Sequence, residues 1–284
     1  MNGAGGGTVV AAVLLAAVLH ATWNALAKSF SDRLAAFTLM GLASAACTVP
    51  LLGLAPAPAR AAWWALGTSA LLHTGYNLLL LAAYRLGDFN QVYPLARGTG
   101  PLLVAAVAAM ALHERLGGAQ LGGVLAVSGG ILLLSAGRVP SGTSARPAIL
   151  AALATGVMIA AYTVVDGVGV RHSGTAIGYT AWLFALEGPA MPLVALALRR
   201  GGLWRSLDGH WPLGLLCGVL SVAAYGLVIW AQTRGALAAV AALRESSVVV
   251  AAAIGALVFH ERFGHRRILA SAAIAAGVVL LNLH

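Results

Sequence analysis

Two arginines in apolar surroundings are the residues with the clearest chemical potential. Arg97 follows "NQVYPLA" and Arg244 follows "LAAVAAL", each about a third of the way into a long apolar stretch. An arginine near the centre of a membrane helix costs about 2.5–3.5 kcal/mol on insertion scales, so each needs a partner or must reach an interface. That partner is either an acidic residue of this chain, Asp166, Glu187 or Glu245, or an anionic group of a bound solute. A guanidinium fork matches a carboxylate, phosphate or phosphonate.

Polar residues recur with the same spacing in two further hydrophobic runs, "LHATWNALAK" and "HTGYN". The polar positions are His20, Trp23 and Asn24 in the first run and His73, Tyr76 and Asn77 in the second. Positions i, i+3 and i+4 share one face of a helix, so each trio is expected to face protein or a wet cavity rather than lipid. Each trio either lines a solute pathway or hydrogen-bonds between helices, which contributes about 0.6 kcal/mol on average.

Other aromatic, acidic and hydroxyl residues complete the set of candidate binding residues. Deep aromatic rings wall an amphipathic pocket or simply pack, and an acidic group neutralises an arginine or carries a proton. Glu245 adjoins Arg244, and successive residues of a helix do not face each other, so we do not expect these two side chains to meet. The remaining candidates are Tyr93, Tyr162, Asp166, Tyr179, Trp182, Tyr225 and Ser246.

The composition places these residues in a membrane protein. Of the 284 residues, 60% are hydrophobic and only 9% are charged, and the mean hydropathy is +0.90. A soluble domain carries roughly a quarter charged residues. The net charge of +9 would suggest nucleic acid in a soluble protein. Here the basic residues cluster between apolar runs, where they contact lipid headgroups and set the topology, so we expect a lipid bilayer and no nucleic acid as partner.

The apolar runs predict an all-α integral membrane protein with ten transmembrane helices. Their lengths fit helices, because barrel strands would be about ten residues long with strict alternation. The expected spans are 8–28, 34–54, 61–85, 90–112, 118–136, 147–169, 174–198, 211–233, 236–259 and 267–283.

The two halves of the chain resemble each other. "RGTGPLLVAAVAAMALHERLGG" at 97–118 aligns with "RESSVVVAAAIGALVFHERFGH" at 244–265, a shift of 147 positions. Five spans per half make the halves enter the membrane in opposite directions, which predicts an inverted repeat with its binding site near the midplane. We expect a first repeat over 1–136, a linker over 137–147 and a second repeat over 148–284.

These motifs resemble the drug/metabolite transporter superfamily, in particular its ten-helix EamA-type branch. In that branch a Gly-Glu-Arg-like triplet ends the fourth helix of each repeat; here it reads His-Glu-Arg, at 113–115 and 260–262. The resemblance implies a secondary transporter working by alternating access, often an exporter of amino acids or other small metabolites. The "HATWN" start is similar to a sub-branch associated with phosphonate use, so a permease for phosphonates or other organic anions is the alternative.

The resemblance also includes cationic multidrug pumps, which have a membrane Glu eight residues before a Lys in their first helix. Here His20 stands eight residues before Lys28, which argues against a cationic multidrug exporter and leaves proton coupling open. The sequence contains no GxxxxGK[ST], HExxH or CxxC motif, so no cofactor, metal site or enzymatic activity is expected. An intramembrane enzyme using His20, His73, Asp166 and Glu187, or a non-transporting membrane sensor, remains as another class.

The expected setting is the bacterial inner membrane, crossed many times, with a small-molecule substrate and a monomer or homodimer. Orientation is open between two indications. Loops on the side of the N-terminus hold 4 of the Lys and Arg residues and the opposite loops hold 11, with Arg97 and Arg244 set aside. The positive-inside rule therefore favours both termini outside, whereas ten-helix relatives usually have both inside.

Overall fold

The computed structural model describes residues 3–27, 29–86, 89–135, 145–199, 203–257 and 265–282, and within them every regular element is helical. The linker predicted at 137–147 lies largely outside the described residues, and so does the second His-Glu-Arg triplet. The elements are α1 (Gly3–Ala27), α2 (Arg33–Thr48), α3 (Leu51–Leu54), the 3₁₀ helix η1 (Arg60–Ala62), α4 (Trp63–Leu86), α5 (Phe89–Ala111), α6 (Gly118–Ser135), α7 (Ala145–Ser173), α8 (Ala176–Glu187), α9 (Ala190–Arg199), α10 (Leu203–Leu207), α11 (Trp211–Gln232), α12 (Leu237–Arg244), α13 (Ser247–Leu257) and α14 (His265–Asn282).

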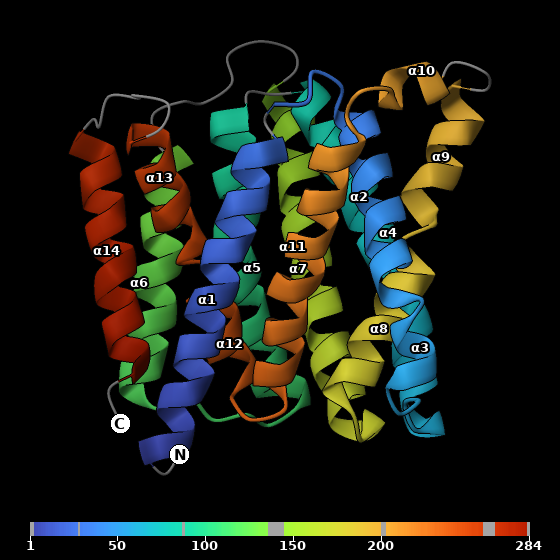
Figure 1. The fold of residues 1–284 in the computed structure, drawn as a ribbon. Coiled ribbons are helices and arrows are strands. Elements are labelled where there is room, and N and C mark those ends of the chain that lie inside the picture. The colour runs from blue at the N-terminus through green and yellow to red at the C-terminus, as the bar shows by residue number, and fades with distance from the viewer. Residues whose placement is uncertain are drawn as a thin grey trace.

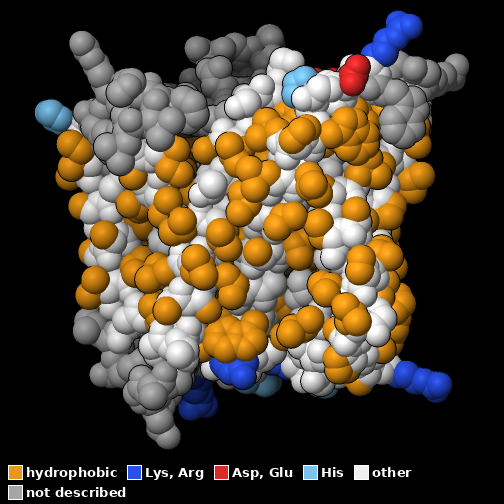
Figure 2. Space-filling model, in the orientation of Figure 1, with side chains coloured by type: hydrophobic (Ala, Val, Ile, Leu, Met, Phe, Trp, Pro, Cys, Tyr) orange, Lys and Arg blue, Asp and Glu red, His pale blue; other side chains and the backbone are white. Residues whose placement is uncertain are grey.

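These helices cross the molecule side by side (Figure 1). Within the described residues, seven spans are long and apolar enough to cross a membrane by themselves, and α6 and α14 supply shorter apolar helices. The tenth span is α4, which is as long as the others but carries the polar stretch "HTGYN". The visible face is covered with hydrophobic side chains, and basic residues lie at its two ends (Figure 2). The ten-helix membrane fold is therefore confirmed, with each span within a few residues of its predicted bounds.

The two repeats are inverted relative to each other, as predicted. The chain begins and ends at the same end of the molecule, and α1 and α7, which open the two repeats, run in opposite directions (Figure 1). The repeats also interlock, because α1 packs on α11 and α5 packs on α7. Between α6 and α14 the backbones approach closely: a Cβ added to Gly277 would lie 2.8 Å from the carbonyl oxygen of Gly123. Small residues allow this approach, so this pair of helices is scaffold.

Three spans that the sequence predicts as single helices are broken, and the first of them, span two, divides into α2 and α3 at Val49-Pro50. Span seven divides into α8 and α9 at Gly188-Pro189, where a Cβ on Gly188 would lie 2.7 Å from the carbonyl oxygen of Gly41 on α2. Span nine divides into α12 and α13 around Glu245 and Ser246. There the backbone N–H groups of both residues bond three residues back, a local 3₁₀ tightening.

Hydrogen bonds of Arg171 and Glu114 join the two repeats at the end of the molecule where the chain begins. The Arg171 guanidinium donates to the carbonyl oxygens of Gln232 and Gly235 at 2.9 and 2.8 Å and to the Glu114 carboxylate at 2.9 Å. Glu114 also accepts from the N–H of Leu237, the first residue of α12, at 2.9 Å. A carboxylate there satisfies an unpaired donor of the helix and suits its dipole. The first His-Glu-Arg triplet thus ties span four to the start of span nine.

The turn that presents Glu114 explains why glycine suits the first position of such triplets. His113 has a φ of 54°, in the left-handed region where glycine commonly ends a helix. Histidine is tolerated in this region better than most side chains.

A second ion pair lies at the opposite end. Asp32 caps α2 by accepting from the N–H groups of Leu34 and Ala35, and it accepts a hydrogen bond from Arg199 at the end of α9. Burial by itself would raise the pKa of Asp32, but the bonds from Arg199 and the backbone outweigh it and lower the pKa. The pair is part-exposed, with each side chain 29% exposed, so its contribution to stability is small.

Candidate functional site

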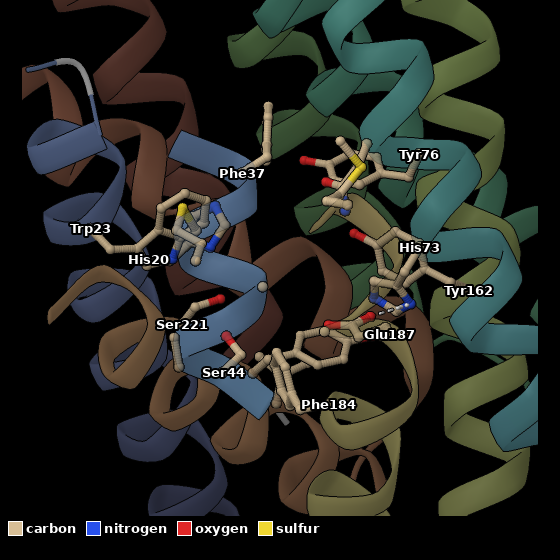
Figure 3. A pocket seen from close by; sticks show the side chains of 18 of the residues that line it. His20, Trp23, Phe37, Ser44, His73, Tyr76, Tyr162, Phe184, Glu187 and Ser221 are labelled. Carbon is tan, nitrogen blue, oxygen red and sulfur yellow. Dashed lines mark ion pairs between the residues drawn. The ribbon is translucent and has the colours of Figure 1, made fainter. Parts of the chain in front are cut away.

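A cavity of about 120 Å³ lies between the two repeats. By the same measure a water molecule needs about 10–15 Å³, so the cavity has room for a small solute. Residues of α1, α2, α4, α5, α7, α8, α9, α11 and α12 contribute to its wall (Figure 3). Its lining is Ala16, His20, Trp23, Phe37, Met40, Gly41, Ser44, His73, Tyr76, Asn77, Arg97, Tyr162, Phe184, Glu187, Gly188, Met191, Ser221, Ala224, Tyr225, Val228 and Arg244.

Both buried arginines line this cavity, and one carboxylate lies between them. The Nε of Arg97 lies 2.7 Å from Oε2 of Glu245, close in distance though not aligned as a hydrogen bond. A terminal nitrogen of Arg244 lies 3.4 Å from Oε1 of the same carboxylate. Arg97 and Arg244 are 2% and 4% exposed and Glu245 is fully buried. Two guanidinium groups and one carboxylate leave this trio with a net positive charge at the wall.

The contact between Arg244 and Glu245 corrects the expectation that these neighbours do not meet. That expectation assumes a regular helix, in which successive side chains diverge by about 100°. The helix ends at Arg244, and the tightened turn that follows carries Glu245 beside both arginines. The internal partner of the arginines is therefore Glu245, and neither Asp166 nor Glu187 forms an ion pair with an arginine among the described residues.

The two arginines are held to different degrees. Arg97 also contacts Nε2 of His20 and donates to Oγ of Ser247, each at 3.2 Å, and its guanidinium lies 5.7 Å from the ring centre of Tyr93. Arg244 lies 6.0 Å from the ring centre of Tyr162, and its buried Nε has no hydrogen-bond partner among the described residues. Arg244 therefore has more hydrogen-bonding capacity left for a solute.

Aromatic rings form another side of the cavity. His73 stacks on Tyr162 with ring centres 4.0 Å apart, and Tyr76 meets Tyr162 edge-on at 5.7 Å. Tyr225 packs edge-on against His73 at 5.4 Å and against Phe184 at 6.2 Å. The polar trio of α4 is thus turned from lipid toward the cavity and the rings of α7 and α11. Such a wall accommodates an apolar or aromatic body.

An acidic group lies on this aromatic side. Oε2 of Glu187 lies 3.5 Å from Nδ1 of His73 (Figure 3). The same oxygen is buried and has no hydrogen-bond partner among the described residues. From the sequence, Glu187 is a candidate only for a counterion or a proton carrier. Its position before Gly188-Pro189, inside an apolar span, was the signal that could have marked it as a lining residue.

Asp166 lies behind the aromatic wall rather than in it. It is fully buried and accepts hydrogen bonds from the hydroxyl groups of Tyr179 at 2.9 Å and Tyr225 at 2.5 Å. The carboxylate therefore orients Tyr225, which does line the cavity.

The structure brings most of the predicted binding residues to one cavity. Those in its lining are His20, Trp23, His73, Tyr76, Asn77, Arg97, Tyr162, Tyr225 and Arg244. Those outside its lining are Asn24, Tyr93, Asp166, Tyr179, Trp182 and Ser246.

Most of the predicted residues outside the lining have other contacts. The Asn24 amide bonds back to the carbonyl oxygen of His20 within α1, at 2.8 Å. Tyr179 is completely buried, and Trp182 packs edge-on against Trp63, with ring centres 4.7 Å apart. The hydroxyl of Ser246 is buried without a hydrogen-bond partner among the described residues. Sharing a helix face with a cavity residue was thus not sufficient to place these side chains in the wall.

Several lining residues had no signal in the sequence. Phe37, Met40 and Ser44 come from α2, and Ser221 comes from α11. They lie in ordinary apolar runs, and only the packing of α2 against α11 brings them together. Among the described residues there is no group of three or more His, Cys, Asp or Glu that could hold a metal ion.

Comparisons with known proteins agree with this architecture. A solved crystal structure matches with a TM-score of 0.72 and 18% identity over 96% of both chains, which shows a shared fold. No curated protein matches the chain significantly. The model of the EamA-like transporter family matches twice, over residues 7–136 and 146–283. These two matches cover nearly all of the sequence, and the chain therefore belongs to the EamA-like transporter family.

Proposed function

We propose that this transporter exports small amphipathic metabolites that carry a carboxylate or related anionic group, such as amino acids, by alternating access. The anionic group binds to Arg97 and Arg244 from the cavity, and the rest of the solute packs on the aromatic wall. The protein works in a bacterial inner membrane as a monomer or homodimer, without cofactor, catalysis or nucleic acid.

One observation carries the proposal. Arg97 and Arg244 occupy equivalent positions of the two repeats, and both line the same cavity. A buried charge is retained in a membrane protein when it is paired or functional. Here one carboxylate serves two guanidinium groups, so the trio attracts a second anion. Because the site lies between inverted repeats, rocking one repeat against the other exposes it to each side in turn.

The test is uptake and binding by purified protein in liposomes. A thermal-shift screen of amino acids, phosphonates and quaternary amines first identifies a bound solute, and counterflow then measures its transport. Arg244→Ala is expected to weaken binding about tenfold or more, because a hydrogen bond to a charged group contributes about 1.5–3 kcal/mol. Arg234→Ala is the matched control, since Arg234 is exposed and lies over the ring of Trp230 at the end of α11.

Control and variant separate a binding role from a structural one. Arg244→Ala should keep a folded yield close to that of the wild type, and Arg234→Ala should keep both yield and binding. Equal losses of yield and transport in Arg244→Ala would assign Arg244 to structure and remove the anionic-cargo proposal. Preferential binding of quaternary amines would favour a cationic cargo instead.

A further inference from the structure

The carboxylate of Glu187 is an acceptor that the protein does not satisfy. It belongs to the last residue of α8, which lines the cavity beside His73, and it has a buried oxygen without a hydrogen-bond partner among the described residues (Figure 3). A buried polar atom left unpaired costs free energy, so its persistence in a native structure calls for a partner that is bound at another stage.

His73 does not fill this role. Its Nδ1 lies 3.0 Å from the carbonyl oxygen of Ser69 and 3.1 Å from the Ser69 hydroxyl, but 3.5 Å from Glu187. A carbonyl oxygen only accepts, so the Nδ1–H of His73 is directed to Ser69. The Glu187 carboxylate therefore keeps unused acceptor capacity, and the residue itself is part of the cavity lining.

The surroundings of Glu187 favour a positively charged ligand. The residue ends the twelve-residue helix α8, and a helix C-terminus carries partial negative charge that attracts cations. Phe184, one turn earlier, and Tyr225 place their rings in the same wall. The faces of such rings attract an ammonium group by about 0.5–2 kcal/mol. Carboxylate, helix end and rings together form an acceptor-rich, cation-preferring subsite.

This subsite is separate from Arg97 and is not paired with Arg244. Arg97 contacts His20 on α1, and Figure 3 shows His20 and Glu187 on different sides of the cavity. Among the described residues Glu187 forms no ion pair with either arginine. The cavity wall therefore holds basic groups and an acidic group that are not paired with each other, with aromatic rings beside the acidic group.

We propose that Glu187 binds the ammonium group of the cargo, so that the transporter selects zwitterions over plain anions. This inference rests on the proposed function, because the carboxylate of the same solute binds at the arginines. The structure thereby assigns a residue to each charged group of the cargo.

Three probes with one aromatic body test the assignment: phenylalanine, 3-phenylpropionate and phenethylamine. Dissociation constants are measured at pH 7 for the wild type, Glu187→Gln, Glu187→Asp and the control Asp208→Asn, whose carboxylate is exposed in the turn after α10. The wild type should bind phenylalanine at least tenfold more tightly than 3-phenylpropionate. Glu187→Gln should reduce this ratio to about twofold by weakening phenylalanine alone, whereas Glu187→Asp and Asp208→Asn should retain a clear preference.

The outcomes distinguish this inference from the proposed function. Equal binding of phenylalanine and 3-phenylpropionate by the wild type, with loss of both in Arg244→Ala, would overturn the role of Glu187 and leave the arginine site standing. Binding of phenethylamine as tight as that of phenylalanine, lost in Glu187→Gln, would keep the ammonium subsite and overturn the anionic site. Absence of binding by all three probes would overturn both.

A last experiment tests whether Glu187 binds a proton instead of the ammonium group of the cargo. Flux driven by a pH gradient is measured in the same liposomes for the wild type and Glu187→Gln. If Glu187→Gln abolishes the effect of the gradient but keeps the preference for phenylalanine, Glu187 carries a coupling proton and the ammonium assignment is wrong.

Discussion

The segments around Arg97 and Arg244 are equivalent in sequence, yet they fold differently. The first is part of α5, which continues as one helix past Pro94 and Pro101. The second breaks into α12 and α13 beside Arg244, although it contains no proline. At the break stands Glu245, and the equivalent position of the first repeat is Gly98.

The break in span nine supplies the two arginines with a counterion. A regular helix would direct Glu245 away from Arg244, whereas the tightened turn places its carboxylate within ion-pair distance of both arginines. A membrane interior penalises unpaired charge by several kcal/mol, more than the cost of a local 3₁₀ turn. Two copies of one motif thereby share a single counterion, and the site stays basic.

The largest effect is expected from removing that counterion. Glu245→Gln leaves two buried guanidinium groups without a carboxylate and should lower the free energy of unfolding by about 3–5 kcal/mol. Unfolding of the purified protein by denaturant or heat measures the loss. The double variant Glu245→Gln/Arg244→Gln should recover part of it, because one uncompensated charge is removed as well. Stability unchanged in the single variant would mean that the trio is not the determinant of this region.

The two arginines should differ in how much each contributes to the stability of the fold. Arg97→Gln should lower the free energy of unfolding by about 3 kcal/mol, because it removes the shorter pair to Glu245 and the bond to Ser247. Arg244→Gln should cost only about 1 kcal/mol, since the pair between Arg97 and Glu245 remains. Relative to its loss of stability, Arg244→Gln should weaken solute binding more than Arg97→Gln does. The reverse order of stabilities would contradict the view that Arg97 is the better-held arginine.

Gly98, the residue of the first repeat equivalent to Glu245, allows the comparison of the two segments to be tested in the first repeat. A Cβ at this position would lie 2.9 Å from Cγ of Leu132 on α6, so α5 has no room there for a second Glu245. Gly98→Ala should cost about 1–3 kcal/mol by overpacking, measured as a lower unfolding temperature. Gly129→Ala is the matched control, because nothing lies within 4 Å of its added Cβ and alanine favours a helix. Equal effects of the two substitutions would show that α6 can shift to admit a side chain.

The smallest effect concerns the part-exposed pair of Asp32 and Arg199, which contrasts with the buried trio. The pKa of Asp32 is lowered in the folded protein, so the pair stabilises the fold above the ordinary range of aspartate near pH 4. This contribution is lost as the pH falls through the lowered pKa. Asp32→Asn keeps a capping side chain and should cost less than about 1 kcal/mol at pH 7, and nothing at about pH 2 or below. A constant difference across this pH range would exclude the ion pair as its cause.

Much of the fold could be predicted because the information is local. Apolar runs of about 20 residues mark membrane helices whatever they pack against. The two halves align and each has an odd number of spans, so they must cross the membrane in opposite orientations. The polar positions of α1 and α4 were recognisable as well, because polar groups in a membrane helix turn away from lipid. Which of these side chains bind a solute stays a prediction.

The sequence by itself therefore determined the ten spans, the inverted repeat and the two buried arginines as the residues in need of partners. Only the tertiary structure decided that Glu245 is their shared counterion, that Glu187 lines the cavity and that Asn24 and Trp182 do not. The physical reason is that a side chain's partners lie on helices distant in sequence. Helix breaks and close backbone contacts such as that of Gly188 with Gly41 set the rotation of each helix, and periodicity within one helix carries no information about them.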